Sequence, residues 1–275
     1  MAPDKPLLLH GDCIQLLQSL PDHSVDLVLT DPPFGCTKAD WDKPLDLSAL
    51  WAQLQRVLKK TGTVLLFGYE GFTVDLINSN RDWYRYRYVW VKSRPSRFMD
   101  YKVRPMPKFE DIVVFMGGGI KSAWFYPERT FGHKPYKTVR STSKVSGLWE
   151  FNDKETAGAI RISDGTDGGR YPTTVLEYGV VSSSRRRHPT EKPAGLLQQL
   201  IKCHCPPEGT VLDFCMGSGS TGVAAAVCGR RFIGMELNDH FYHEACKVLD
   251  ETHARLNPPL IKDTLSMDST VNVSM

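Results

Sequence analysis

Four consecutive residues, Asp31-Pro32-Pro33-Phe34, bring together a carboxylate, two rigid rings and an aromatic face. An aromatic amino group is a poor nucleophile because its lone pair is delocalised into its own ring. Asp31 and the carbonyl of Pro32 could accept its two N–H groups and so free the lone pair, while the prolines hold both acceptors rigid. Phe34 would offer a face for stacking on the ring. A strand stopped by prolines has the same sequence, so the motif gains its meaning from its surroundings.

A second group of residues could hold a nucleoside. Residues 211–222, VLDFCMGSGSTG, have the pattern of a strand, a Gly-rich turn and the start of an Ala-rich helix. Glycines there let a ligand approach the backbone closely, and Gly217, Gly219 and Gly222 fit the G-x-G-x-x-G spacing of dinucleotide sites. The next strand ends in Glu236, where a carboxylate can accept hydrogen bonds from both ribose hydroxyls.

Asp213 bears on which nucleoside ligand fits. Its carboxylate at the strand end would repel a pyrophosphate and would suit a ligand with a cationic amino-acid portion, as S-adenosyl-L-methionine has. The glycine spacing alone leaves a nicotinamide-dependent oxidoreductase open, but that function would leave the Pro-Pro turn unexplained. No metal is expected, because Cys203-His204-Cys205 has no second ligand pair at zinc-like spacing.

These groups must be positioned by alternating strands and helices. Apolar runs predict strands over 7–10, 25–30, 63–68, 85–92, 110–116, 210–213 and 231–237, and helical periodicity predicts helices over 46–60, 71–79, 190–203, 218–228 and 240–256. A short helix should also follow Asp12, its expected cap. Such alternation predicts an α/β fold with a mostly parallel sheet covered on both faces. Asp31 and Asp213 would then lie at strand ends, where ligand sites of such sheets occur.

Charge is distributed unevenly along the chain. The net charge is +3, yet residues 81–149 carry 15 Lys and Arg against 5 Asp and Glu. A basic segment indicates a polyanionic partner, although a solvated basic face has the same composition. The arginines that could grip phosphates are Arg94, Arg97, Arg104, Arg185, Arg186 and Arg187. With no apolar run of about 18 residues, no secretory signal and seven cysteines, no membrane contact and a cytoplasmic location are expected.

The motifs together resemble the β group of DNA amino-methyltransferases. Thr30 to Phe34 is similar to D-P-P-Y/F, and residues 211–221 are similar to D-P-F-x-G-S-G-T. His188-Pro189-Thr190-Glu191-Lys192-Pro193, Gly11-Asp12-Cys13 and the stretch from Arg104 to Phe115 match further family elements. The resemblance runs from about residue 7 to 250, in the β-group order with the catalytic motif first. Phe34 in place of Tyr should still stack, and Phe214-Cys215-Met216 departs from P-F-A/C without changing the glycines.

This resemblance implies a Rossmann-like methyltransferase fold, circularly permuted, with seven strands in the family order 3-2-1-4-5-7-6. It implies a catalytic domain over 1–117 and 188–256, an irregular target-recognition insertion over 118–187, and a flexible tail over 257–275. Asp31, Pro32, Pro33 and Phe34 would be catalytic. The cofactor S-adenosyl-L-methionine would be bound by Asp12, Thr190, Lys192, Asp213, Gly217, Ser218, Gly219 and Glu236.

The implied reaction is methylation of an exocyclic amino group on a flipped base of double-stranded DNA, as in restriction-modification or phage enzymes. An Asp-starting motif is more typical of adenine N6 enzymes, and Ser-Pro-Pro of cytosine N4 enzymes, so adenine is favoured and cytosine stays open. A DNA-binding protein without catalysis and a methyltransferase for RNA or protein also remain open. A homodimer and a cognate restriction nuclease are compatible with the sequence without being required by it.

Overall fold

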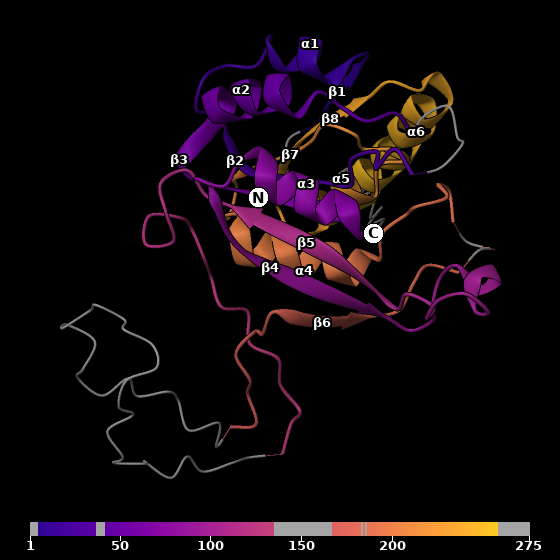
Figure 1. Ribbon diagram of the computed structural model, residues 1–275. Coiled ribbons are helices and arrows are strands. Elements are labelled where there is room, and N and C mark those ends of the chain that lie inside the picture. Colours follow the sequence, from indigo (N-terminus) through magenta and orange to yellow (C-terminus); the bar gives the residue numbers. More distant parts are fainter. Residues whose placement is uncertain (1–4, 37–41, 135–166, 183, 185, 258–275) are drawn as a thin grey trace, which may run out of the picture.

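The computed structural model describes residues 5–36, 42–134, 167–182, 184 and 186–257. Within them the strands form one eight-stranded sheet in the order β1-β8-β7-β2-β3-β5-β4-β6 (Figure 1). The strands are β1 (Leu7–His10), β2 (Val25–Thr30), β3 (Leu58–Gly68), β4 (Tyr84–Lys92), β5 (Phe109–Phe115), β6 (Val175–Tyr178), β7 (Thr210–Asp213) and β8 (Arg231–Glu236).

The sheet is mostly parallel, as the alternating pattern predicted. Only β5 runs against its neighbours β3 and β4, while every other pair among the described strands is parallel. The seven strands implied by the family resemblance are present in the implied order, beginning with β1 and β8 at one edge. The eighth strand, β6, pairs with β4 at the other edge. It comes from the segment 118–187, which was expected to be irregular.

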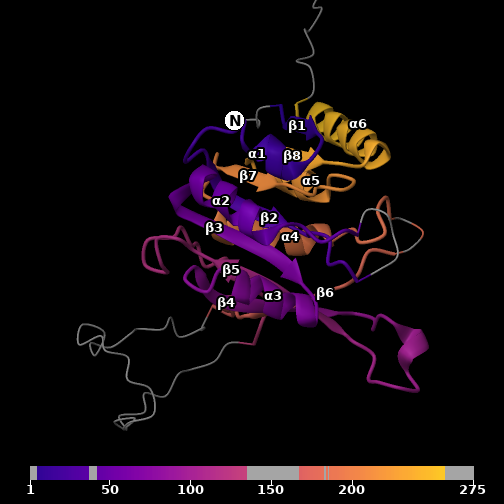
Figure 2. The same cartoon turned by 45° about the horizontal axis from the view of Figure 1, so that its top comes forward.

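Helices cover both faces of this sheet (Figure 2). The first face packs against α1 (Cys13–Leu17), α2 (Leu47–Val57) and α3 (Gly71–Ser79). The second packs against α4 (Ala194–His204), α5 (Ser220–Val227) and α6 (Asp239–Leu256). Each face of the sheet has its own hydrophobic core. Side chains alternate along a strand, so in β3 Val64 and Leu66 join the core of the first face, while Leu65 and Phe67 join the core of the second. This two-sided burial explains the apolar runs in the central strands, such as Val64 to Phe67.

Helix boundaries follow local chemistry. The Asp46 carboxylate caps α2 by accepting from the Ser48 and Ala49 N–H groups at 2.9 and 3.1 Å. The helix predicted to reach residue 60 ends at Val57 instead, because the chain turns into β3 at Leu58, which pairs with Val25 of β2. Helix α5 begins at Ser220 rather than 218, since Gly219 has a φ of +83° that no α-helix contains.

Described residues of the segment 118–187 contact both the sheet and helix α4. The Trp124 N–H donates to the Thr61 carbonyl and the Tyr126 N–H to the Cys203 carbonyl, both at 2.9 Å. A short helix, η1 (Phe98–Asp100), lies in the connection between β4 and β5. No helix among the described residues is long and apolar enough to cross a bilayer.

One buried carboxylate ties three neighbouring strands together at the end of the sheet opposite the strand carboxyl ends. Asp26 of β2 is 5% exposed. Its oxygens accept from Lys59 Nζ of β3 at 2.8 and 2.9 Å, and Oδ2 also accepts from the Thr210 N–H of β7 at 2.8 Å. Asp26 therefore satisfies a buried backbone donor and fixes the relative register of β2, β3 and β7.

We expect Asp26→Ala to lower the free energy of unfolding by about 3 kcal/mol, since it leaves the Thr210 N–H and the Lys59 ammonium without their acceptor. Urea denaturation followed by circular dichroism measures this. The control is Asp22→Ala, which removes an exposed partner of Arg56 and should cost less than about 1 kcal/mol. Equal losses in the two variants would contradict the role given to Asp26.

Candidate active site

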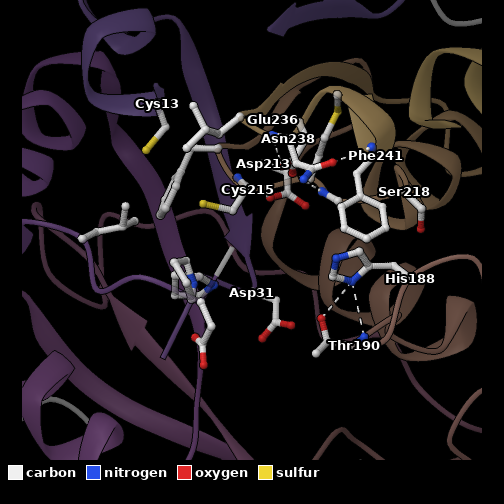
Figure 3. Close-up of a pocket in the computed structure, with 18 of the residues that line it drawn as sticks. Cys13, Asp31, His188, Thr190, Asp213, Cys215, Ser218, Glu236, Asn238 and Phe241 are labelled. Carbon is white, nitrogen blue, oxygen red and sulfur yellow. Dashed lines mark hydrogen bonds between the residues drawn. The ribbon is translucent and has the colours of Figure 1, made fainter. Parts of the chain in front are cut away.

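A cavity of about 630 Å³ lies at the carboxyl ends of the central strands. Its walls are the turns that follow β2, β7 and β8, the segment that precedes α4, and the start of α1 (Figure 3). Among the described residues its lining carries seven carboxylates (Asp12, Asp31, Asp42, Glu191, Asp213, Glu236 and Asp239) and two lysines (Lys43 and Lys192). The cavity therefore favours a cationic ligand over a phosphate.

The Gly-rich turn after β7 forms one wall of the cavity. Gly217 and Gly219 have φ angles of +52° and +83°, which residues other than glycine rarely adopt. The Gly217 N–H donates to Glu236 Oε2 at 2.9 Å, and Glu236 Oε1 accepts from the Asn238 N–H at 2.8 Å (Figure 3). Glu236, at the end of β8, thus holds the turn in shape and presents its carboxylate to the cavity. Ser218 is buried in the same wall.

Asp213 ends β7 and is 3% exposed. Its Oδ1 accepts from the Cys215 N–H at 3.1 Å. Burial raises the pKa of Asp213 to about 7, against the opposing effect of the Thr221 hydroxyl and the Cys215 N–H. The group therefore exchanges between carboxylic acid and carboxylate near neutral pH, and a cation in the cavity would favour the carboxylate.

Asp31 follows β2 directly, and its turn is joined to the Gly-rich wall because the Phe214 N–H donates to the Thr30 hydroxyl at 3.2 Å. Asp31 Oδ2 forms an ion pair with Lys192 Nζ. Its Oδ1 is buried and makes no hydrogen bond within the described residues. Burial raises the pKa of Asp31, and the Lys192 ammonium opposes that rise. The site thus holds a buried acceptor atom at the place where the sequence predicted one.

Lys192 is buried, with a side chain 7% exposed. Its Nζ also donates to the Thr190 carbonyl at 3.3 Å and lies 3.6 Å from Glu110 Oε2. Burial lowers the pKa of Lys192, but the Asp31 and Glu110 carboxylates outweigh burial and raise it. Lys192, expected from the sequence to bind the cofactor, lines the cavity, and its ammonium also contacts the Asp31 carboxylate that is predicted to be catalytic.

Phe34 is half-buried and lies against Phe72, with ring centroids 5.1 Å apart and planes tilted by 33°. The turn that follows is held by Asp42, whose carboxylate accepts from the Gly35 and Cys36 N–H groups at 2.7 and 3.0 Å. Sequence reasoning missed Asp42, since nothing in the local pattern marks a loop aspartate that reaches back seven residues.

Other residues predicted from the sequence also line the cavity. Asp12 caps α1 through the Gln15 N–H at 3.0 Å and also lines the cavity. The Thr190 hydroxyl and His188 Nδ1 are 3.0 Å apart, and the His188 and Phe241 rings have centroids 4.2 Å apart with planes inclined by 68° (Figure 3). Burial, with a smaller effect of Lys192, lowers the pKa of His188 to about 4, so this ring is neutral at physiological pH.

The arginines proposed for phosphate contact that the structure describes do not line the cavity. Arg97 and Arg104 both pair with Glu70, and Arg94 is exposed nearby in the sequence. Arg186 and Arg187 are exposed beside the segment that carries Lys192, and Arg186 donates to the Pro189 carbonyl at 2.8 Å. Arg185 lies outside the described residues, as do residues 135–166 of the insertion and the tail after Asn257. The described arginines come from two segments of the chain, residues 94–104 and 186–187.

Comparison with known proteins identifies relatives along most of the chain. A family model described as DNA methylase matches residues 25–247. The type II methyltransferase M.HinfI of Haemophilus influenzae is 26% identical over 276 residues, covering 89% of this chain and 68% of the relative.

Solved structures share the fold. The M1.HpyAVI–SAM complex aligns with a TM-score of 0.59 at 20% identity, covering 89% of this chain and 98% of that one. The cytosine-N4-specific PvuII DNA methyltransferase aligns with a TM-score of 0.59 at 16% identity, covering 93% of each chain. At these identities the likeness is one of architecture.

The charge balance around Lys192 can be tested without any ligand. Lys192→Met would leave the buried Asp31 carboxylate without its cation, so its pKa in the folded protein would rise further above the value in the unfolded chain. A raised pKa contributes stability at low pH that is lost as pH rises. We therefore expect a loss of about 3 kcal/mol at pH 8 and about half of that at pH 5, measured by urea denaturation.

The matched control for this variant is Lys202→Met, which removes an exposed lysine 3.4 Å from Glu128. It should cost less than about 1 kcal/mol at both pH values. A loss in Lys192→Met that is the same at pH 5 and pH 8 would show that the ammonium does not compensate a titrating carboxylate.

Proposed function

Because the chain belongs to the DNA methylase family, we propose that it transfers a methyl group from S-adenosyl-L-methionine to the N6 amino group of adenine in double-stranded DNA. The observation that carries the proposal is Asp31 Oδ1, a buried acceptor without a hydrogen bond in the described structure, on a residue that lines a cavity beside a Gly-rich turn. A buried acceptor without a donor costs free energy unless a ligand supplies one. An amino group of a base is such a donor.

The chemistry of the cavity fits S-adenosyl-L-methionine. When bound, this cofactor supplies a methyl group on a cationic sulfur, and its amino-acid end carries an ammonium group. Asp213 and its acidic neighbours suit these positive charges, and Glu236 suits the ribose hydroxyls. The nicotinamide alternative lacks support, because seven carboxylates in the described lining would repel a pyrophosphate.

The proposed roles of the chain's own groups follow from their positions. A base inside a duplex cannot enter this cavity, so the target must be flipped out. Asp31 Oδ1 and the Pro32 carbonyl accept the two amino hydrogens, and Phe34 stacks on the base. The bound cofactor would supply the methyl group, and the amino nitrogen, cationic once methylated, would shed one proton. Asp31, whose pKa burial raises, is placed to receive it.

We favour adenine over cytosine as the target because the catalytic motif begins with Asp31. An exocyclic amino group on either base offers the same two N–H donors, and the cytosine-N4-specific PvuII enzyme has the same fold. Cytosine N4 is therefore the second candidate. The Asp-starting motif supports adenine, since cytosine N4 enzymes more often begin it with Ser.

DNA contacts are proposed for the basic surface outside the cavity. Arg94, Arg97 and Arg104 lie in the connection between β4 and β5, and Arg186 and Arg187 precede the segment with Lys192. Residues 1–117 and 188–256 would form the catalytic domain, with target recognition assigned to 118–187. An acidic cavity with arginines outside it would bind the cofactor inside and the phosphate backbone outside.

The test is methylation of unmethylated genomic DNA in vitro, followed by nucleoside mass spectrometry. We expect N6-methyladenine from the wild-type chain and a loss of about 100- to 1,000-fold in rate for Asp31→Ala, with cofactor binding kept. N4-methylcytosine as the product would show that the target base is cytosine and not adenine. An Asp31→Ala variant with wild-type rate would overturn the site.

Cofactor affinity should depend on pH through Asp213. Because its pKa lies at about 7 in the free protein, binding a cation requires the carboxylate and becomes harder as pH falls. We expect the Kd for S-adenosyl-L-methionine to rise about tenfold from pH 8 to pH 6, since each pH unit below the pKa removes about nine-tenths of the charged form.

Isothermal titration calorimetry at several pH values measures this dependence. Asp213→Asn is the matched variant: it should bind more weakly at pH 8 and show a Kd that changes less than about twofold over the same range. An unchanged slope in Asp213→Asn would assign the pH dependence to another group.

A further inference from the structure

Four charged side chains form a buried row that leads from the sheet into the cavity: Lys92, Glu110, Lys192 and Asp31. They come from the end of β4, the start of β5, the segment before α4 and the turn after β2. Their side chains are 8%, 14%, 7% and 18% exposed. Positive and negative groups alternate along the row. Only its last member, Asp31, has a role in the function proposed above.

Lys192 lies between two carboxylates and pairs with both, but it is closer to Asp31 than to Glu110. Its Nζ forms an ion pair with Asp31 Oδ2 and stands 3.6 Å from Glu110 Oε2. Charge-assisted hydrogen bonds of this kind measure about 2.7–2.9 Å, so a movement of about 1 Å would transfer the ammonium to Glu110. Such a movement is within the reach of a flexible lysine side chain.

Glu110 is prepared to receive that ammonium. Its Oε1 is held by Lys92 Nζ at 2.5 Å, which fixes the carboxylate in place. Its Oε2 is buried and makes no hydrogen bond within the described residues. Burial raises the pKa of Glu110, but Lys192 and Lys92 outweigh burial and lower it, so the group is a carboxylate at neutral pH.

The proposed reaction, on which this inference rests, creates a need for such a second position. Asp31 must accept hydrogens from the target amino group, and an ammonium bonded to the same carboxylate competes for its charge. The target nitrogen also becomes cationic as it is methylated, and a neighbouring ammonium would repel it. Lys192 should therefore lie on Asp31 in the empty site and away from it during methyl transfer.

We propose that Glu110 is a positioning residue that takes the Lys192 ammonium from Asp31 when the target base enters the cavity. In the empty enzyme, Lys192 compensates the buried Asp31 charge. In the substrate complex, the amino group of the base replaces Lys192 at Asp31, and Glu110 Oε2 gains its missing donor. The row thus exchanges one ion pair for another without leaving a buried charge unpaired.

The test is Glu110→Gln, which keeps the shape and removes the charge. On unmethylated DNA we expect kcat to fall at least about tenfold, with cofactor affinity unchanged. Lys192 would lose one of the two carboxylates that raise its pKa, so kcat of this variant should recover as pH rises and the ammonium deprotonates. The charged or titratable groups that act on Lys192 are Asp31, Glu110 and His188, with Lys92 behind Glu110.

A double-mutant cycle separates this role from a structural one. In a Lys192→Met background there is no ammonium to move, so adding Glu110→Gln should change kcat less than about twofold. Asp111→Asn is the control, because Asp111 is a buried carboxylate next in the same strand that bonds to Thr73 and lies 3.6 Å from Arg87 instead. It should keep wild-type kcat.

The outcomes are distinct. Wild-type kcat in Glu110→Gln, or an equal loss with and without Lys192, would overturn the role of Glu110. An inactive wild-type chain would instead contradict the proposed function. Thermal unfolding and cofactor binding verify folding, and Glu110→Ala, which also removes the carboxylate, replaces Glu110→Gln if that variant does not fold. It should show the same loss of kcat, and a wild-type value would overturn the proposal.

Discussion

A carboxylate taken out of water must be compensated, and the placement of Asp31 follows from that requirement. Asp31 lies in a turn at the end of a central strand, where neighbouring elements exclude solvent. Its cation comes from Lys192, 161 positions away in the sequence. Lys192 reaches it only because α4 packs its apolar side, with Leu196, Leu197 and Leu200, against the second core. The packing of α4 on the sheet therefore also supplies the positive charge that compensates Asp31.

In the Gly-rich wall of the cavity, carboxylates compensate buried backbone N–H groups. A turn built from glycines leaves N–H groups unpaired, and Glu236 accepts one of them while Asn238 donates to its other oxygen. The carboxylate proposed to hold the ribose is therefore also the group that shapes the turn. Asp213 is held by the Cys215 N–H in a similar way. These carboxylates are oriented by the protein before any ligand arrives, which reduces the cost of binding.

Charge is separated between the inside and the outside of the site. Carboxylates dominate the described lining of the cavity, whereas the described arginines of the two basic segments lie outside it. A cationic small molecule and a polyanion would accordingly be attracted to different places. The net charge of +3 does not show this separation, because the 34 Lys and Arg and the 31 Asp and Glu of the chain nearly cancel.

The sequence by itself determined the features that depend on near neighbours. Apolar runs located the strands, Asp12 and Asp46 marked two helix starts, and the glycines of 217–219 marked the turn where φ must be positive. The order of motifs also indicated the order of the seven strands. These signals are reliable because backbone conformation is fixed by a few adjacent residues.

Tertiary structure alone decided which distant groups meet. Nothing in the local pattern indicated that Lys192 would bond to Asp31, that Glu110 would stand behind it, or that Asp42 would hold the turn after Phe34. Strand β6 was missed because a four-residue strand at a sheet edge, VLEY, buries only Leu176 and shows no clear alternation of its own. The physical reason is common to all of these: such contacts are set by how helices pack on the sheet, and packing brings together residues whose sequences carry no mark of one another.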